Sequence, residues 1–421
     1  MKFLHTADWH LGDSFHGFDR EEEHEHFLNW LLGVIQNEEP DALLLCGDIY
    51  DNGNPSASAE RQLYGFLTRA VAAVPRMKII MIAGNHDSSL RLEAPRSLYE
   101  CMDIEVRGVV KRDNKDNICW NDLLIPIEAR SNPDDKMIVA TIPFLRPDDM
   151  EKGKSTSEGF RLFASELIGR GCEMYGKNTP MVLMAHIYAV GAHFAEEEHS
   201  ERACIGGQDC VNTSKLGNEV AYAALGHIHK EQNVARQDNV RYSGSALPMS
   251  FAEKNYEHGI IKVEIADGQT VINKISYEPL RRLMTIPEEG SATPDEVLKL
   301  LSNLPKAHEK DDAASWPYLE IGVEEMSPNP ATVGAIIKAT QDRAVRLCRT
   351  IRVRPGGERR CDTEPVATVE DLRKINPAQI ARALYKNHYG EDMPDEIARL
   401  FAEVKREQEK LLANGQDEDK E

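Results

Sequence analysis

Five apolar segments spread along this chain each lead directly into acidic, amide or histidine side chains. A short apolar run bounded by turn residues is typical of a buried strand. Side chains at the carboxyl ends of strands can meet at one edge of a sheet, even when they are far apart in the sequence. The chain is therefore constrained to a sheet-based fold with a polar site at that edge. The candidate site residues, in chain order, are Asp8, His10, Asp48, Asn85, His86, His186, His227 and His229.

Glycine and residue spacing refine the pattern in the first three groups. Gly47 comes directly before Asp48, and Gly84 opens the third group, so the chain can turn sharply where the polar side chains begin. Asp8 and His10 are two residues apart, so they point to the same side if the first strand continues through them. A carboxylate at Asp48, directly after a tight turn, could bridge two ions.

Taken singly, none of these groups indicates a metal site. An Asp-x-His pair is usually an accident of composition, and a Gly-Asn-His-Asp run is typical of a turn. Five such groups, each at a predicted strand end, instead indicate a centre for two divalent cations. Imidazole, carboxylate and amide ligands without a thiolate suit manganese or iron better than a closed structural zinc site.

Three residues beside the candidate ligands need separate interpretations. Cys46 follows a run of leucines and is predicted to be a small buried side chain rather than a ligand. Asp51 and Asp87 each have two interpretations. Either carboxylate could orient a ligand histidine, or it could be a plain turn residue.

The five groups resemble the motifs of the calcineurin-like metallophosphoesterases, which carry these ligand types in this order. The resemblance is closest to the nuclease branch of that family, which acts in double-strand-break repair, and it extends over nearly the full chain. Besides the five groups, it is carried by residues 1–12, 142–147, 200–211 and 242–245.

The resemblance implies a role for each candidate residue. One metal would be held by Asp8, His10, Asp48 and His229, and the other by Asp48, Asn85, His186 and His227. In that assignment Asp48 bridges the two metals, and a water activated by both attacks phosphorus. His86 would protonate or steady the leaving oxygen as the catalytic residue. The cofactors implied are two Mn²⁺ ions, with Fe²⁺ or Mg²⁺ as possible substitutes.

The fold class implied is α/β, a four-layer metallophosphoesterase sandwich of two mixed sheets flanked by helices, followed by smaller units. We predict a nuclease domain at residues 1–278, a small α+β capping domain at 279–354, a linker at 355–368, a C-terminal helical pair at 369–414 and an acidic disordered tail at 415–421. The capping domain would either orient DNA or only brace the core. Its pattern predicts strands at 281–286, 316–323 and 344–353 and helices at 295–301 and 331–339.

The resemblance also implies partners. These are DNA, a second copy of the chain, and an SbcC-type ATPase with a coiled coil, assembled as a homodimer within a heterotetramer. No Walker A sequence is present, so any ATP dependence would come from outside this chain. The C-terminal helices carry an apolar stripe at Ile397, Leu400, Phe401 and Val404. The stripe could dock on the coiled coil or pack against the protein's own body.

The net charge of −20 is unexpected for a protein that binds DNA through a basic surface. The acidic runs at 21–23, 196–198 and 417–421 are expected to be solvated surface. Local basic residues could still contact DNA near the site. The candidates are Arg91, Arg96, Arg146 and Lys254, and the partner would supply most of the positive surface.

Composition predicts a cytoplasmic protein without a membrane span. No apolar stretch reaches 18 residues. Residues 1–5 are predicted to be a strand that leads into the first ligand group, not a removable signal peptide. The eight cysteines lack paired spacing, which is typical of a reducing compartment.

Three functions compete. The resemblance favours a manganese-dependent exonuclease and endonuclease on double-stranded DNA ends and hairpins, in DNA repair, recombination and replication. A second candidate is another binuclear-metal phosphoesterase, such as a protein phosphatase or nucleotide hydrolase. Protein phosphatases, however, carry Gly-Asp-x-x-Asp-Arg-Gly at the second group, and here Asn52 and Gly53 follow Asp51. The third candidate, a non-catalytic scaffold, would be expected to have lost ligands.

Overall fold

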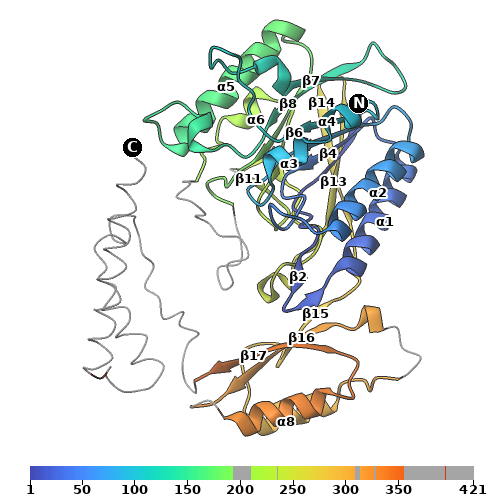
Figure 1. Cartoon of the computed structure of the whole chain (residues 1–421), viewed down its shortest axis with the longest axis vertical. Coiled ribbons are helices and arrows are strands. Elements are labelled where there is room, and N and C mark those ends of the chain that lie inside the picture. Colours follow the sequence, from blue (N-terminus) through green and yellow to red (C-terminus); the bar gives the residue numbers. More distant parts are fainter. Residues whose placement is uncertain (193–209, 235, 309–312, 327–328, 355–393, 395–421) are drawn as a thin grey trace, which may run out of the picture. The chain divides into compact units, whose positions relative to one another are not determined.

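Two six-stranded mixed sheets form the body of the protein (Figure 1). The computed structural model describes residues 1–192, 210–234, 236–308, 313–326, 329–354 and 394. The first sheet has the order β14 (Gln269–Ser276), β13 (Gly259–Ala266), β1 (Lys2–Thr6), β4 (Ala42–Cys46), β5 (Lys78–Ile82) and β6 (Ile104–Arg107). The second has the order β11 (Gln232–Val234), β12 (Gln237–Tyr242), β10 (Tyr222–Gly226), β9 (Met181–His186), β8 (Lys136–Ile142) and β7 (Leu124–Glu128).

The central strands of both sheets are parallel, as the alternation of strands and helices predicts. Strands β1, β4, β5 and β6 pair in parallel in the first sheet, and β8, β9, β10 and β12 do so in the second. All five residues of β4 are buried, because a central parallel strand is covered on both faces. The carboxyl ends of β1, β4 and β5 therefore meet at one edge of their sheet, and those of β9 and β10 meet at one edge of theirs.

Three long helices cover the outer faces of the two sheets. The helices α1 (Glu21–Glu38) and α2 (Ala57–Ala73) pack on the first sheet, and α5 (Thr156–Tyr175) packs on the second. Between the sheets, Phe3, Leu44 and Ile80 from the first meet Val139 and Val182 from the second in one buried cluster. Helix, sheet, sheet and helix layers follow one another, so the predicted four-layer α/β sandwich is confirmed.

Short elements connect these layers. They are β2 (Ser14–Phe15), β3 (Phe18–Asp19), α3 (Ser89–Glu93), α4 (Arg96–Glu100) and α6 (Leu216–Glu219), with 3₁₀ turns η1 (Trp120–Leu123), η2 (Pro147–Asp149), η3 (Phe251–Glu253) and η4 (Ala313–Ser315). No helix among the described residues is long and apolar enough to cross a membrane. The six cysteines that the structure describes are all free thiols.

A third, three-stranded sheet follows the body. Its parallel strands are β15 (Leu283–Ile286), β16 (Tyr318–Glu324) and β17 (Arg346–Val353), covered by α7 (Pro294–Ser302) and α8 (Pro330–Thr340). Each element lies within two residues of its predicted bounds. Thr293 is the N-cap of helix α7, and Glu296 lies three residues later. The two residues form a capping box at the start of the helix.

A buried ion cluster joins α1 to the third sheet. The Glu23 carboxylate accepts hydrogen bonds from Arg20 Nε at 3.2 Å, Arg281 Nη1 at 3.0 Å and the Tyr318 hydroxyl at 2.7 Å. The prediction that residues 21–23 are solvated surface is therefore wrong for Glu23, which has no exposed surface. Two arginines and a hydroxyl compensate its desolvation, and removing it would leave buried charges unpaired.

The chain divides into two units, residues 1–358 and residues 359–421. The first contains both the sandwich and the third sheet. The predicted linker at 355–368, helical pair at 369–414 and tail at 415–421 lie outside the described residues, as does the acidic run at 196–198.

His5 makes the folded state sensitive to acid. Its Nε2 donates to the Leu225 carbonyl oxygen at 3.1 Å, so its Nδ1 accepts from the Tyr222 hydroxyl at 2.9 Å. Complete burial lowers the pKa of His5 to about 3. In the unfolded chain a histidine pKa is about 6.5, so protonation favours unfolding: the stabilisation is full above about pH 6.5 and is lost as the pH falls toward 3.

We expect the wild-type free energy of unfolding to fall by about 1.4 kcal/mol between pH 7.5 and pH 5.5 through His5 alone. Urea unfolding at the two pH values measures this. The variant His5→Gln, although less stable overall, should show a pH dependence smaller by that amount. An equal pH dependence in both proteins would contradict the assignment.

Candidate metal centre

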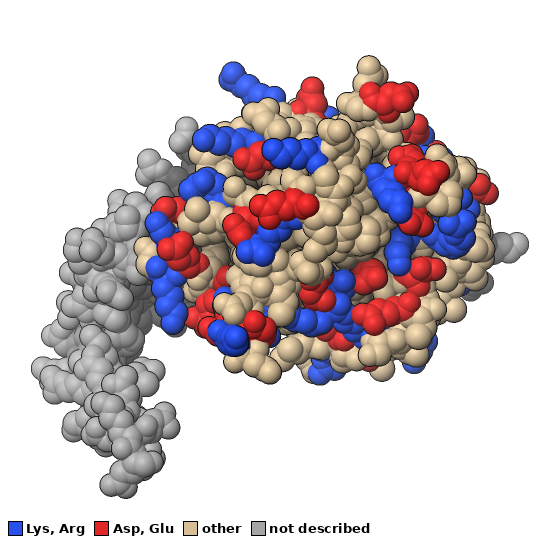
Figure 2. All heavy atoms as spheres, turned by 90° about the horizontal axis from the view of Figure 1, so that it is seen from above, with Lys and Arg blue, Asp and Glu red and all other residues tan. Residues whose placement is uncertain are grey.

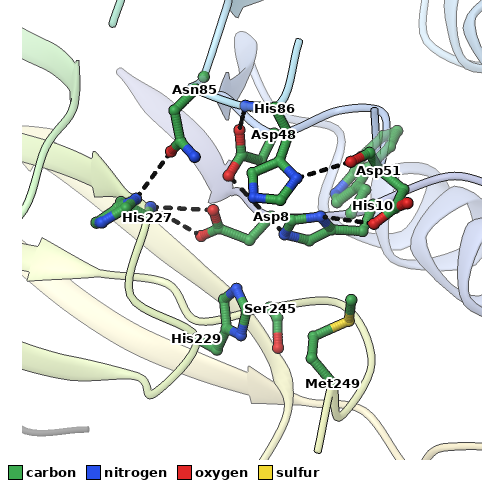
Figure 3. A network of polar contacts seen from close by, with 12 residues as sticks. Asp8, His10, Asp48, Asp51, Asn85, His86, His227, His229, Ser245 and Met249 are labelled. Atoms are coloured by element: carbon green, nitrogen blue, oxygen red, sulfur yellow. Dashed lines mark hydrogen bonds and ion pairs between the residues drawn. The ribbon is translucent and has the colours of Figure 1, made fainter. Parts of the chain in front are cut away.

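All eight candidate side chains lie together where the parallel strands end. Figure 3 labels seven of them, all but His186. Asp8 follows β1 by two residues, and Asp48 follows β4 by two. Asn85 and His86 follow β5, and His186 is the last residue of β9. His227 comes directly after β10, with His229 two residues later.

Unusual backbone conformations turn these residues toward one another. Four of the candidate ligands have positive φ: Asp8 at 52°, His10 at 48°, Asp48 at 47° and His227 at 105°. Such conformations are uncommon for residues other than glycine and concentrate at functional sites. Strand β1 ends at Thr6, so the strand alternation expected through Asp8 and His10 is wrong. A bent loop, not a strand, brings the two side chains to the same place.

Asp8, His10 and His229 form the first group that could hold a metal ion, which we call the first ligand cluster. One ligand atom of each lies within 4.8 Å of the others. Both oxygens of Asp8 accept from the His227 backbone N–H, at 3.0 and 3.1 Å, which holds the carboxylate in place. Neither ring nitrogen of the fully buried His10 has a hydrogen-bond partner. Buried polar atoms are nearly always satisfied, so a ring nitrogen of His10 without a hydrogen bond fits a ligand role.

Asp48, Asn85, His186 and His227 form a second candidate metal site, which we call the second ligand cluster. The Asn85 Oδ1 lies 2.9 Å from both His186 Nε2 and His227 Nδ1. His186 Nε2 lies 3.3 Å from Asp48 Oδ2. Adjacent ligands on an octahedral ion with bonds of about 2.1 Å are roughly 3.0 Å apart. The observed spacing therefore fits four ligands of one small divalent cation.

Asp48 lies between the two clusters. Its Oδ1 accepts from the His86 backbone N–H at 2.8 Å. Its Oδ2 lies 3.3 Å from His186 Nε2 in the second cluster and 3.9 Å from His10 Nε2, a ring of the first. One oxygen is thus held by the backbone while the other faces both clusters, as a bridging carboxylate requires.

Backbone carbonyl groups orient two of the histidines. His186 Nδ1 donates to the Cys46 carbonyl oxygen at 2.9 Å, and His86 Nδ1 donates to the Asp51 carbonyl oxygen at 2.7 Å. A carbonyl oxygen only accepts, so each Nδ1 carries hydrogen and each Nε2 is available to the centre. The Cys46 side chain itself is fully buried in the apolar cluster between the sheets.

The charges at the centre favour a cation. Burial raises the pKa of Asp8. Burial acts in the same direction on Asp48, but His186 and His10 lower its pKa below the usual range. Despite its own burial, His186 has a pKa raised to about 9 by Asp48 and Asp8. Burial and the neighbouring His186 lower the pKa of His227 to about 3.

Asp8 and Asp48 form their ion pairs with histidines: Asp8 with His186, and Asp48 with His10 and His186. Buried carboxylates require compensating charge. A protonated imidazole or a bound cation can supply that charge. The donor set of carboxylates, imidazoles and one amide oxygen therefore fits two divalent cations.

The structure separates the two interpretations of Asp51 and Asp87. Asp87 accepts from the backbone N–H groups of Ile49, Tyr50 and Gly84, at 3.2, 3.0 and 2.9 Å. It thus ties the second and third motif loops together and orients no histidine. Burial and the charge of Asp48 raise the pKa of Asp87 to about 6. Asp51 has an oxygen 3.7 Å from His10 Nδ1, within ion-pair distance of that ring but too far for a hydrogen bond.

Gly84 is needed for the close approach of the second and third motif loops. A Cβ atom at this position would overlap the carboxylate and the backbone nitrogen of Asp48. Any larger residue would therefore displace the side chain that lies between the two clusters.

The basic residues near the site are not all available to a ligand. Arg96 donates to both oxygens of Asp122, at 2.6 and 3.1 Å, and Lys254 Nζ donates to Thr285 Oγ1 and the Glu288 carbonyl, both at 2.9 Å. Arg91 and Arg146 are exposed, but Arg91 donates to Asn54 Oδ1 at 3.0 Å and pairs with Glu60 at 3.7 Å. The face shown in Figure 2 has basic and acidic side chains interspersed, not one basic field.

One residue of the site was missed from the sequence. Glu253, in η3, has Oε1 at 3.2 Å from His229 Nδ1. It lies 24 residues after the histidine and outside any motif, so sequence spacing gives no signal for it.

Comparisons with known proteins agree with this geometry. Residues 1–231 match the family model described as calcineurin-like phosphoesterase, and residues 279–389 match one described as type 5 capsule protein repressor C-terminal domain. The chain is 31% identical over 398 residues to the SbcD subunit of the SbcCD nuclease of Rhodobacter capsulatus, covering 91% of this chain and 94% of that protein.

Two further relatives carry the same name. The Escherichia coli K12 protein is 30% identical over 282 residues, covering 64% of this chain and 66% of that protein. The Bacillus subtilis 168 protein is 29% identical over 278 residues, covering 64% and 67%.

Proposed function

Because this chain belongs to the calcineurin-like phosphoesterases, and within them to the SbcD nuclease subunits, we propose that it is a manganese-dependent DNA nuclease. It would hydrolyse phosphodiester bonds at double-stranded DNA ends and hairpins, as an exonuclease and endonuclease in the cytoplasm. The observation that carries the proposal is the position of Asp48 Oδ2, which faces both ligand clusters.

The residues divide into two ligand sets with one shared member. The first set is Asp8, His10, Asp48 and His229, and the second is Asp48, Asn85, His186 and His227. When bound, two divalent cations would activate water and stabilise the charge that develops on a phosphodiester during in-line displacement. Mn²⁺ suits this mixture of oxygen and nitrogen ligands, and Fe²⁺ or Mg²⁺ could substitute.

His86 is the proposed general acid. Its backbone N–H holds Asp48, and its Nδ1 is fixed by the Asp51 carbonyl, so the ring has one orientation. A ring nitrogen of His86 lies within 4.8 Å of ligand atoms of His10 and Asp48. From there its Nε2, when protonated, would donate a proton to the departing oxygen.

The proposal also includes partners. A chain with a net charge of −20 offers little attraction for a polyanion, so we assign most of the DNA-binding surface to an SbcC-type ATPase. Two copies of each chain would form the heterotetramer. Residues 279–354 would act as a cap that orients DNA, held to the body by the Glu23 cluster.

One experiment tests the function and the partner together. The chain is purified with and without the ATPase and assayed with Mn²⁺, with and without ATP, on end-labelled duplex and hairpin DNA, a phosphopeptide and a cyclic nucleotide. We expect manganese-dependent cleavage of DNA and a dependence on ATP only when the partner is present. Activity confined to the phosphopeptide or the cyclic nucleotide would replace the nuclease with another binuclear phosphoesterase.

A further inference from the structure

A buried glutamate lies behind one of the candidate metal ligands. Glu253 is 2% exposed. Its Oε1 lies 3.2 Å from Nδ1 of His229, and its Oε2 accepts from the Met249 backbone N–H at 2.8 Å. Both oxygens are therefore engaged, one by a ring that belongs to the first ligand cluster and the other by the main chain.

This contact fixes the orientation and the proton of the His229 ring. When Glu253 is ionised its carboxylate can only accept, so in this contact Nδ1 of His229 would donate its hydrogen to Glu253. Nε2 is then the ring nitrogen that can act as a ligand in the first cluster, where ligand atoms of His229, Asp8 and His10 lie within 4.8 Å of one another. Carboxylates placed in this way raise the basicity of a ligand imidazole, and losing one typically costs 10- to 100-fold in metal affinity.

The second cluster does not depend on this glutamate. His186 is oriented by the Cys46 carbonyl oxygen at 2.9 Å, and His227 lies 2.9 Å from Asn85 Oδ1. A change at Glu253 should therefore weaken one metal position and leave the other intact.

The turn that carries Glu253 is held on its far side by the third sheet. Phe251 packs against Phe15 and Tyr318, and Lys254 Nζ donates to Thr285 Oγ1 and the Glu288 carbonyl oxygen at 2.9 Å. The carboxylate thus has a rigid support, which is what orientation of a ligand requires.

From these contacts we propose that Glu253 is the positioning residue for His229 and sets the affinity of the ion at the first ligand cluster. This inference rests on the proposed two-metal function. In this role Glu253 contacts neither the substrate nor the metal. Changing this one side chain, which lies outside both clusters, should therefore lower the affinity of one metal position and leave that of the other unchanged.

The test measures Mn²⁺ binding to the full-length chain by calorimetry and by electron paramagnetic resonance, with thermal unfolding as a check on folding. The variants are Glu253→Ala and Glu253→Gln. The control is Glu231→Ala, which removes a partly buried glutamate two residues after His229 that pairs with Arg241 at 2.8 Å. Wild type and control should bind two Mn²⁺ ions with a spin-coupled spectrum.

In Glu253→Ala we expect one ion at wild-type affinity, the other bound 10- to 100-fold more weakly, and loss of the spin-coupled signal at limiting metal. Glu253→Gln can still accept from His229 but not also from Met249, so it should weaken the same ion less. If Glu253→Ala does not fold, the Mn²⁺ affinities of Glu253→Gln test the assignment instead. Unchanged affinity for both ions, or equal weakening of both, in a folded variant overturns the assignment. A wild-type protein that binds no Mn²⁺ instead overturns the proposed function.

Discussion

Replacing Asp48 with alanine is expected to remove both divalent cations and to lower DNA hydrolysis by on the order of 10³-fold or more, because charge stabilisation is usually the largest catalytic contribution. Its Oδ2 faces a histidine from each cluster, at 3.3 and 3.9 Å. Each cluster would lose a negative ligand, and His186, whose pKa of about 9 depends on that carboxylate, would lose its main partner.

Elemental analysis of the purified variant measures the metal content directly. A second measurement is thermal stability, because ligand at 100 times its dissociation constant stabilises a folded protein by about 2.7 kcal/mol. Wild type should gain this stabilisation with Mn²⁺, and Asp48→Ala should not. Asp116→Ala, which alters an aspartate whose side chain is 86% exposed, is the matched control. A normal manganese content in Asp48→Ala would show that the carboxylate does not bridge.

The position of the centre could be predicted from the sequence because each ligand group begins at the end of a strand that is buried almost throughout, or within three residues after it. Strands β4 and β5 are short apolar runs, and the polar residues begin within three positions of their ends. In a parallel sheet such residues meet at one edge regardless of their separation along the chain. The start of α7 was predictable for a local reason, since Thr293 and Glu296 form the capping box at its N-terminus.

What the sequence could not supply depends on contacts between distant segments. The left-handed backbone at Asp8 and His10 follows from how the first loop packs. Glu23 belongs to an acidic run that predicts exposure. It is buried instead against Arg20, three residues before it, and Arg281, 258 residues after it. Glu253 contacts His229 from a turn whose next residue, Lys254, is hydrogen-bonded to Thr285 of the third sheet. None of these partners is marked by periodicity or spacing.

Changing His86 to glutamine is expected to leave both metal positions filled and to lower the turnover of DNA by about 10²- to 10⁴-fold, the usual contribution of a positioned general acid. The backbone N–H that holds Asp48 is retained in this variant, so the bridging carboxylate keeps its support. Metal content and kcat are measured on the same preparation, with His26→Gln, on the outer side of α1 beside Tyr277, as the control.

The choice of substrate separates leaving-group protonation from the other roles of His86. A p-nitrophenyl phosphodiester releases a stable anion that needs no proton, so His86→Gln should hydrolyse it nearly as fast as wild type while DNA cleavage falls. An equal loss on both substrates would mean that the ring acts before bond cleavage, in binding or in orienting the nucleophile. A fall in manganese content would mean that His86, which lies within 4.8 Å of ligand atoms of His10 and Asp48, is itself a ligand.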